Sequence, residues 1–339
     1  MIPPRPPLLK LSRRAALLGA ITVAGCARMP ALSTEPPVED GIFIMTDGAR
    51  LPYRMWQPPA GVPTRAVALA LHGMSDSRDA WEIAAPAFAA GGVALVAPDQ
   101  RGFGATAERG IWPGTAALVD DAGTMLRTVA ARFPGVPLFG IGESMGAAVL
   151  MVLDANRPAT LGATSLAGVA LTAPAVWGRA TMAVPLRVGL FAVSHTLPDL
   201  EMAGGPGQIR ASDNNDALRR LSRDRLTLHR TRLDAVRGLV DLMDAALAAA
   251  PHLTPPALLL YGGKDELVPK ASMTVAWRSL AAGSRTAFYP GGYHLLLRDK
   301  GRATPIADVL AWMDNPLAPL PSGADYVARG WLAAQSDDA

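Results

Sequence analysis

Short, mostly apolar runs recur along the middle of the sequence, and longer stretches with helical periodicity separate them. Runs that are apolar on both faces are typical of parallel strands covered by helices on both sides. The alternation therefore predicts the α/β class, with a mostly parallel, doubly wound sheet. The expected strands are residues 42–45, 51–56, 66–71, 93–97, 136–141, 168–171, 257–261 and 286–289, and the expected helices are 80–90, 115–133, 145–156 and 271–282.

The alternation stops between residues 176 and 250. We expect this segment to be a helical cap inserted into a core made of residues 41–175 and 251–314, with a C-terminal tail at 315–339. Residues 213–250 have the pattern of a long helical stretch whose arginines face solvent, with binding of an acidic ligand as the alternative. The cap also holds an apolar stretch that could line an acyl tunnel, touch a bilayer or form ordinary cap core: Met182, Val184, Leu186, Val188, Leu190 and Phe191.

Residues 1–25 have the order of a secretory signal, with a basic start, a ten-residue apolar stretch and a small residue. Val23-Ala24-Gly25-Cys26 resembles a bacterial lipobox, and Cys26 is the only cysteine in the chain. We therefore expect Cys26 to carry a lipid anchor and residues 26–40 to form a flexible tether. The alternative is an incidental cysteine behind an ordinary signal. The anchor predicts a lipoprotein of the cell envelope, on a membrane and facing the periplasm or the exterior.

Charge and composition exclude several classes of protein. The formal net charge is +3, but residues 1–25 hold four basic residues and no acid, so the rest has 28 basic against 29 acidic residues. A near-neutral mature chain lacks the basic surface that nucleic acid requires. One cysteine leaves no intrachain disulfide and no cysteine metal cage, and no apolar run suits a polytopic membrane protein. Ser12-Arg13-Arg14 resembles the twin-arginine export motif, so the Sec and Tat routes both stay open.

The chemistry starts at Gly142-Glu143-Ser144-Met145-Gly146, between an expected strand and an expected helix. Active residues of such sheets lie in loops at the carboxyl ends of the strands. A tight strand-to-helix turn needs small residues beside the serine, and Gly142 and Gly146 provide them, so that the hydroxyl is exposed. The following helix directs backbone N–H groups toward the same point. The alternative is a glycine-rich turn with a spectator serine.

With three further segments, this motif resembles the α/β-hydrolase family over residues 41–314, in particular its monoacylglycerol-lipase and lysophospholipase-like branch. The segments are Leu71-His72-Gly73-Met74, the stretch from Ala97 to Gly104, and Tyr261-Gly262-Gly263-Lys264-Asp265 with Gly291-Gly292-Tyr293-His294. The resemblance implies an α/β-hydrolase fold with a helical cap. It also implies a serine hydrolase that needs no metal and no cofactor.

A serine hydroxyl needs a base, and a histidine needs a carboxylate to hold one tautomer. Of five histidines, we assign the base to His294, in a Gly-rich loop after the last expected strand. His195, His229 and His252 are expected on the cap or the surface. The family places its acid at Asp265, with the adjacent Glu266 as the alternative. The chain order of serine, acid and histidine is the order of this fold.

An oxyanion needs donors that are already in place. Met145, directly after the nucleophile, is expected to give one backbone N–H, and the family pattern assigns the second to Met74, after His72-Gly73. In the family, the loop that begins at Asp99 is structural, so we assign Asp99 no direct chemistry.

These residues predict hydrolysis of carboxylic esters through an acyl-enzyme, on a small-molecule ester or lipid of the monoacylglycerol or lysophospholipid type. Three alternatives remain open. They are an acyltransferase with the same triad, a proline-iminopeptidase-like peptidase, and a non-catalytic lipoprotein that binds a lipid or a partner. The sequence leaves the natural substrate, the acyl length and the oligomeric state open.

Overall fold

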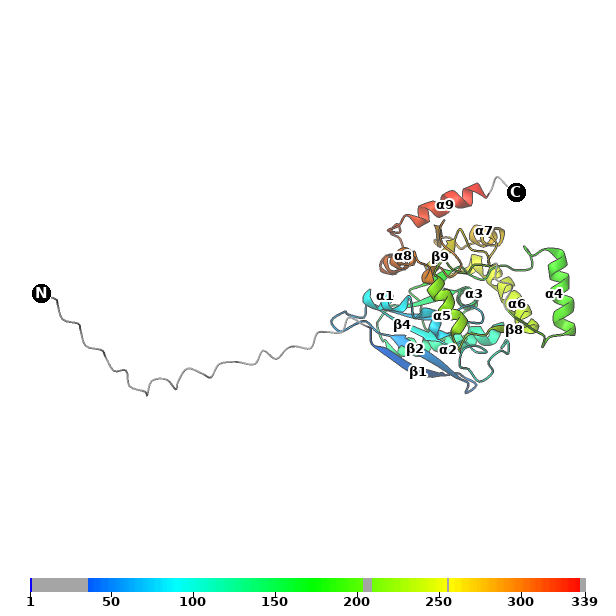
Figure 1. The fold of residues 1–339 in the computed structure, drawn as a ribbon, viewed down its shortest axis with the longest axis horizontal. Helices are drawn as coiled ribbons and strands as arrows, with labels where there is room; N and C mark the ends of the chain where they lie inside the picture. Colours follow the sequence, from blue (N-terminus) through cyan, green and yellow to red (C-terminus); the bar gives the residue numbers. More distant parts are fainter. Residues whose placement is uncertain (2–35, 204–208, 255, 336–339) are drawn as a thin grey trace. The chain divides into compact units, whose positions relative to one another are not determined.

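The computed structural model describes residue 1 and residues 36–203, 209–254 and 256–335, and residues 36 onward belong to one compact unit (Figure 1). The expected signal, Cys26 and most of the expected tether lie outside the described residues. No helix in the described ranges combines the length and apolar character needed to cross a membrane.

An eight-stranded sheet forms the centre, in the order β1-β2-β4-β3-β5-β6-β9-β10. The pairs β1–β2 and β2–β4 are antiparallel and all other pairs are parallel. This sheet, with helices on both faces, confirms the predicted α/β-hydrolase fold class. The strands are β1 (Val38–Ile44), β2 (Arg50–Trp56), β3 (Ala66–Leu71), β4 (Val93–Pro98), β5 (Leu138–Glu143), β6 (Gly168–Thr172), β9 (Ala257–Gly262) and β10 (Arg285–Tyr289).

Two layers of apolar side chains separate the sheet from its helices. One layer holds α1 (Ala85–Ala90) and α8 (Ala303–Asp314), whose Phe88 and Val309 are fully buried. The other holds α2 (Thr115–Arg132), α3 (Met145–Asn156) and α7 (Lys270–Arg278). Residues of β3, β5 and β9 alternate between the two layers, which explains why these strands are apolar on both faces.

The strand ends are aligned along one edge of the sheet. Leu71 of β3 lies opposite Gly142 of β5, and Thr172 of β6 lies opposite Glu143 of β5 on one side and Leu260 of β9 on the other. The loops that follow β3, β5 and β9 therefore leave the sheet side by side. This alignment brings together residues that are remote in the sequence.

The segment between β6 and β9 contains α4 (Val184–Thr196), β7 (Glu201–Ala203), α5 (Asn215–Arg223), β8 (Arg230–Arg232) and α6 (Leu233–Ala249). Helix α6 packs on α3, and α4 packs on α6 (Figure 1). The prediction of one long helical stretch at 213–250 is wrong, because α5 ends at Arg223 and the extended residues of β8 separate it from α6. The Asp224 carboxylate accepts from Leu226 N–H and the Thr227 hydroxyl, and such local bonds compete with a helix.

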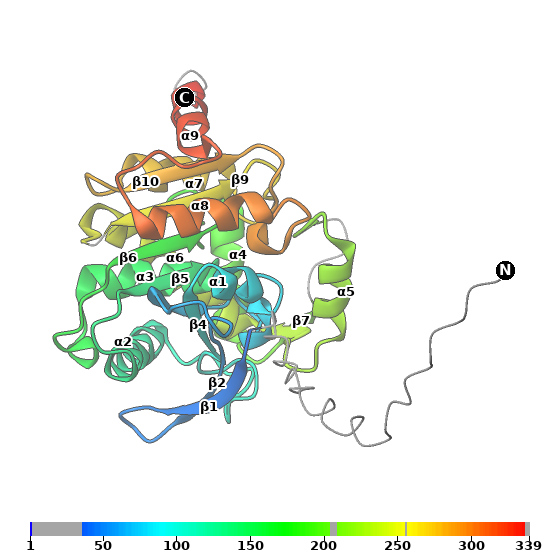
Figure 2. The same ribbon diagram turned by 90° about the vertical axis from the view of Figure 1, so that its left-hand side faces the viewer.

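Other features of the fold also differ from the sequence-based expectation. Strand β1 begins at Val38, so the last residues of the expected tether are in the sheet. The helix expected at 80–90 is divided into a 3-10 turn, η1 (Arg78–Trp81), and α1, which has a proline in its first turn. The tail, for which the sequence predicts no structure, contains α9 (Ala324–Ala334), which packs beside β10 (Figure 2). Trp331 of α9 stacks on Phe288 with ring centroids 4.9 Å apart.

Candidate active site

Ser144 lies between β5 and α3 in a backbone conformation that non-glycine residues rarely adopt. Its φ is 53° and its ψ is −112°, and its N–H donates to the Thr172 carbonyl at 2.9 Å. A Cβ on Gly142 would overlap the Ala147 backbone, and one on Gly146 would overlap the Leu71 carbonyl. The turn therefore requires glycine at both positions, and its strain is the kind found at functional sites.

His294 and Asp265 are joined directly. Nδ1 of His294 lies 2.8 Å from Oδ2 of Asp265, and both side chains are buried. The other oxygen of Asp265 accepts the N–H groups of Leu267 and Val268, at 2.8 and 3.0 Å. The carboxylate is therefore fixed on two sides and holds the imidazole with its Nε2 free to accept a proton.

The electrostatics around His294 favour its protonated form. Burial is the largest single influence and lowers the pKa of His294, but attraction to the Asp265 carboxylate and the hydrogen bond with it act the other way, and the net pKa is raised. The Glu143 carboxylate adds to the increase, and the Arg298 guanidinium opposes it. An imidazolium formed during a reaction at this position is therefore stabilised by the protein.

Close backbone packing joins the loops that carry the acid and the histidine. Lys264 N–H donates to the Gly292 carbonyl at 2.9 Å, and Gly263 N–H donates to the Tyr289 carbonyl at 2.8 Å. A Cβ on Gly262 would overlap the Gly292 backbone. Glycine at positions 262 and 263 therefore lets the two loops touch.

The loop after β3 lies against the nucleophile turn. A Cβ on Gly73 would lie 3.4 Å from the Ser144 Cβ. Met74, the next residue, is partly buried, and Met145 is the first residue of α3 and fully buried. The two residues that the sequence predicts as oxyanion donors therefore belong to the two backbone segments that adjoin Ser144.

His72 has a structural role beside this loop. Its Nε2 accepts the Gln100 N–H at 3.0 Å, and its Nδ1 lies 2.8 Å from the Gly73 carbonyl, which fixes Nδ1 as the protonated nitrogen. Burial lowers the pKa of His72, so the ring is neutral. Gln100 Nε2 also donates to the His72 carbonyl at 2.7 Å. These bonds link the loop after β3 to the loop after β4.

Asp99 organises the loop after β4, in line with its expected structural role. It is fully buried, accepts the N–H groups of Arg78 and Ala105 at 2.8 Å each, and forms an ion pair with the Arg78 side chain. Arg101 pairs instead with Asp121 and Asp47. These bonds account for Asp99 without any role in the chemistry.

The other candidates from the sequence lie elsewhere. Glu266, the alternative acid, accepts the Arg210 N–H at 2.9 Å, whereas its neighbour Asp265 contacts the histidine. His195, His229 and His252 are exposed. Within the described ranges, no group of three or more His, Cys, Asp or Glu side chains is arranged to hold a metal ion.

A buried ion cluster beside Ser144 was not predicted. Arg298, four residues after His294, forms ion pairs with Glu143 and with Asp76. Glu143 is the variable residue of the serine motif, and nothing local in the sequence links it to an arginine 155 positions away. The available signal was weak: a charged residue directly before the nucleophile, at the end of an otherwise apolar strand, needs a partner if it is buried.

Comparisons with known proteins identify the family of the chain. The family model described as serine aminopeptidase, S33, matches residues 62–301. A monoacylglycerol lipase of Mycolicibacterium smegmatis is 26% identical over 281 residues, covering 81% of this chain and 96% of the relative. A monoglyceride lipase of Mus musculus is 26% identical over 289 residues, covering 83% and 92%.

Solved structures have the same fold. A soluble variant of the Saccharomyces cerevisiae monoglyceride lipase superposes with a TM-score of 0.69 at 18% identity, covering 83% of this chain and 96% of that one. A carboxyl esterase of Bacillus coagulans gives a TM-score of 0.66 at 19% identity, covering 82% and 98%. Because the family model spans well over half of the sequence, the chain belongs to the serine aminopeptidase S33 family of α/β-hydrolases.

Proposed function

We propose that the protein hydrolyses lipid-like carboxylic esters through an acyl-enzyme on Ser144, with His294 as the base and Asp265 as the residue that orients it. The family and the lipase relatives identify the chain as a carboxylic ester hydrolase. The observation that carries the assignment of roles is the 2.8 Å hydrogen bond between His294 and Asp265, at the sheet edge where Ser144 has a strained backbone.

The reaction has two steps. The Ser144 hydroxyl attacks the ester carbonyl while His294 takes its proton, and the tetrahedral oxyanion accepts the Met74 and Met145 N–H groups. The intermediate collapses, the C–O bond to the alcohol breaks, and His294 gives its proton to the leaving oxygen. Water then attacks the acyl-enzyme with His294 again as the base, which releases the acid and restores the serine.

The cap supports a lipid-like substrate. Helix α4 exposes Val184, Val188 and Phe191, at 59%, 58% and 64%. A cavity of about 690 Å³ lies beside it, and its lining combines apolar residues of α4 with arginines of α4 and α6. Two relatives are named monoacylglycerol lipase and monoglyceride lipase, which supports an ester of glycerol with one acyl chain as the substrate. Lysophospholipids also have a single acyl chain.

The proposal includes an envelope location. The lipobox-like Val23-Ala24-Gly25-Cys26 predicts a lipidated cysteine that tethers the enzyme beside a membrane. The test is metabolic labelling with an alkynyl fatty acid in a bacterial host. We expect the intact chain to be labelled and a Cys26→Ser variant to be unlabelled. Equal labelling of both chains would contradict the anchor.

The catalytic proposal is tested by labelling with a fluorophosphonate and by hydrolysis of p-nitrophenyl esters of increasing length. We expect Ser144→Ala to lose both signals and to keep its melting temperature, whereas Ser222→Ala, at an exposed position of α5, keeps both. Unchanged turnover in Ser144→Ala would refute the assignment.

The family description also names an aminopeptidase, so a prolyl anilide is assayed in parallel with monoacylglycerols. Turnover of the anilide alone would favour the peptidase alternative. Product analysis with an added alcohol acceptor separates hydrolysis from acyl transfer.

A further inference from the structure

Arg298 is a buried arginine whose two carboxylate partners come from two other loops. Its side chain is 6% exposed, and those of Asp76 and Glu143 are 7% and 4% exposed. Its Nη2 lies 2.7 Å from Oδ2 of Asp76 and also contacts Oε1 of Glu143, while Nε lies 3.4 Å from the second Glu143 oxygen. One guanidinium therefore binds two separate carboxylates out of water.

The three loops joined in this way are those that carry the proposed catalytic groups. Asp76 lies two residues after Met74, Glu143 lies directly before Ser144, and Arg298 lies four residues after His294. We propose that Arg298 is a positioning residue that fixes the oxyanion loop, the nucleophile turn and the histidine loop relative to one another. This inference rests on the proposed function, because it assigns Arg298 a part in the same reaction.

The oxyanion loop needs support from outside. Ser75, directly after Met74, has a φ of 65°, a strained conformation for a residue with a side chain. Oδ1 of Asp76 accepts the Ser77 N–H at 2.8 Å, which leaves Oδ2 for Arg298. The cap supplies a separate restraint, because Leu228 N–H donates to the Ser75 carbonyl at 2.7 Å. Of these bonds, the one between Asp76 and Arg298 ties this loop to the histidine loop.

The choice of arginine follows from the geometry. A guanidinium has five N–H donors in a flat, fixed fork, so it can hold two carboxylates in defined directions. A lysine keeps the charge but presents it as a point at the end of a flexible chain. Replacing Arg298 by lysine therefore separates the positioning role from the need for a buried positive charge.

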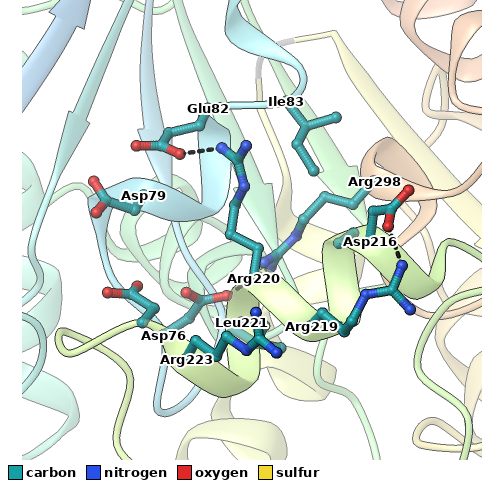
Figure 3. A pocket seen from close by; sticks show the side chains of 12 residues that line it. Asp76, Asp79, Glu82, Ile83, Asp216, Arg219, Arg220, Leu221, Arg223 and Arg298 are labelled. Atoms are coloured by element: carbon teal, nitrogen blue, oxygen red, sulfur yellow. Dashed lines mark hydrogen bonds and ion pairs between the residues drawn. The ribbon is translucent and has the colours of Figure 1, made fainter.

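Arg298 and Asp76 also line a cavity of about 500 Å³ between the loop after β3 and α5 (Figure 3). Figure 3 shows the Arg298 side chain extending toward Asp76 beneath Arg220, which pairs with Glu82 across the cavity. The cavity leaves space beside the cluster, so the loops are not locked by packing on that side. On that side, the ion pairs of Arg298 are the contacts that connect Asp76 and Glu143 to the histidine loop.

The test compares Arg298→Lys with the wild type and with Arg285→Lys. Arg285 is a matched control because it is also largely buried and ion-paired, at the opposite end of β10. The substrate is a short, soluble p-nitrophenyl ester, and rates are normalised to the sites that react with a fluorophosphonate. Affinity for a trifluoromethyl ketone, which forms a tetrahedral adduct with a reactive serine, reports on the oxyanion geometry.

We expect Arg298→Lys to lower kcat about 10- to 100-fold, because a misplacement of about 1 Å can cost that much. Ketone affinity falls by a similar factor, and KM changes less than about threefold, since only interactions made in the transition state are lost. Arg285→Lys keeps wild-type values for all three. A role in stability alone would lower the melting temperature and leave kcat per reactive site and ketone affinity unchanged.

Two further variants cover the case in which Arg298→Lys does not fold. Asp76→Asn and Glu143→Gln each remove one of the two ion pairs of Arg298 and leave it with one carboxylate. Each is expected to lower both kcat and ketone affinity. When Glu143→Gln is added to Arg298→Lys, kcat should fall by a smaller factor than when Glu143→Gln is made in the wild type. Wild-type kcat and ketone affinity in the folded variants would overturn the inference. Failure of the wild type to hydrolyse esters or react with the fluorophosphonate would instead overturn the proposed function.

Discussion

The Ser212 hydroxyl, in the segment before α5, donates a 2.6 Å hydrogen bond to the Asp299 carboxylate, five residues after His294. Asp299 also accepts the Tyr293 N–H at 2.8 Å, and both Ser212 and Asp299 are buried. Leu295 N–H donates to the Ala211 carbonyl at 2.9 Å. Hydrogen bonds therefore join the cap segment directly to the histidine loop.

Ser212→Ala should weaken this connection. The change removes one hydrogen-bond partner of the buried Asp299 carboxylate, and burial raises the pKa of this group. We expect a loss of about 1–3 kcal/mol in the free energy of unfolding. A fall of several-fold in kcat should accompany it, measured with a soluble ester alongside thermal denaturation. Ser222→Ala, on the exposed face of α5, is the control and should change neither quantity. Identical stability of the two variants would argue against a link between cap and base.

Asp265→Asn should retain the fold and lose activity. An asparagine cannot fix the imidazole tautomer or stabilise the imidazolium, so kcat/KM is expected to fall about 10³- to 10⁴-fold. Glu266→Gln is the matched control at the next position, and it should stay within about twofold of the wild type. Steady-state kinetics with a p-nitrophenyl ester measure both. A larger loss in Glu266→Gln would reverse the assignment of the acid.

The pH dependence of activity should move when Glu143 is changed to Gln. His294 acts as a base only when neutral, so kcat/KM rises with pH through the pKa of His294. Burial is the largest single influence and lowers that pKa, Asp265 and Glu143 raise it, Arg298 opposes them, and the net pKa is raised. Removing the Glu143 charge lowers the pKa, so the half-maximal pH of kcat/KM shifts downward.

The control for this shift is Glu39→Gln, at the surface, where Glu39 pairs with Arg132. This variant should leave the half-maximal pH unchanged. A profile of kcat/KM against pH for the three proteins measures the shift. A move to higher pH in Glu143→Gln would contradict the electrostatic account of His294.

Gly146→Ala should destabilise the protein. A Cβ at this position would overlap the Leu71 carbonyl of β3, and neither backbone segment can move without disturbing the sheet. We expect a loss of about 1–3 kcal/mol or more in the free energy of unfolding. Gly330→Ala is the control in a second helix, α9, where a Cβ meets nothing within 4 Å. That variant should gain about 0.5–1 kcal/mol, because alanine favours a helix. Chemical denaturation of both proteins checks the contrast.

Much of the fold could be predicted from the sequence because its signals are local. A parallel strand buried on both faces is apolar throughout, and the glycines around Ser144, Asp265 and His294 mark turns that must be tight. The assignment of Asp265 and His294 also used the resemblance to the α/β-hydrolase family, whose chain order of serine, acid and histidine these residues match. The site assignments themselves stay predictions until the serine, the acid and the histidine are substituted.

What the sequence did not predict depends on contacts between remote segments. The ion cluster joins Arg298 to Glu143 and Asp76, and no spacing or periodicity records such a contact. At the break after α5, the Asp224 side chain accepts the Leu226 N–H, a local bond that competes with helical hydrogen bonds. The position of α9 depends on Trp331 finding an aromatic surface made by other elements.

The contact between Trp331 and Phe288 has a consequence for biosynthesis. The outer strand β10 emerges from the ribosome before the helix that shields it, so Phe288 and Trp277 stay uncovered while the last part of the chain is being made. A chain that stops before α9 would leave these two rings without the indole of Trp331 that packs on them.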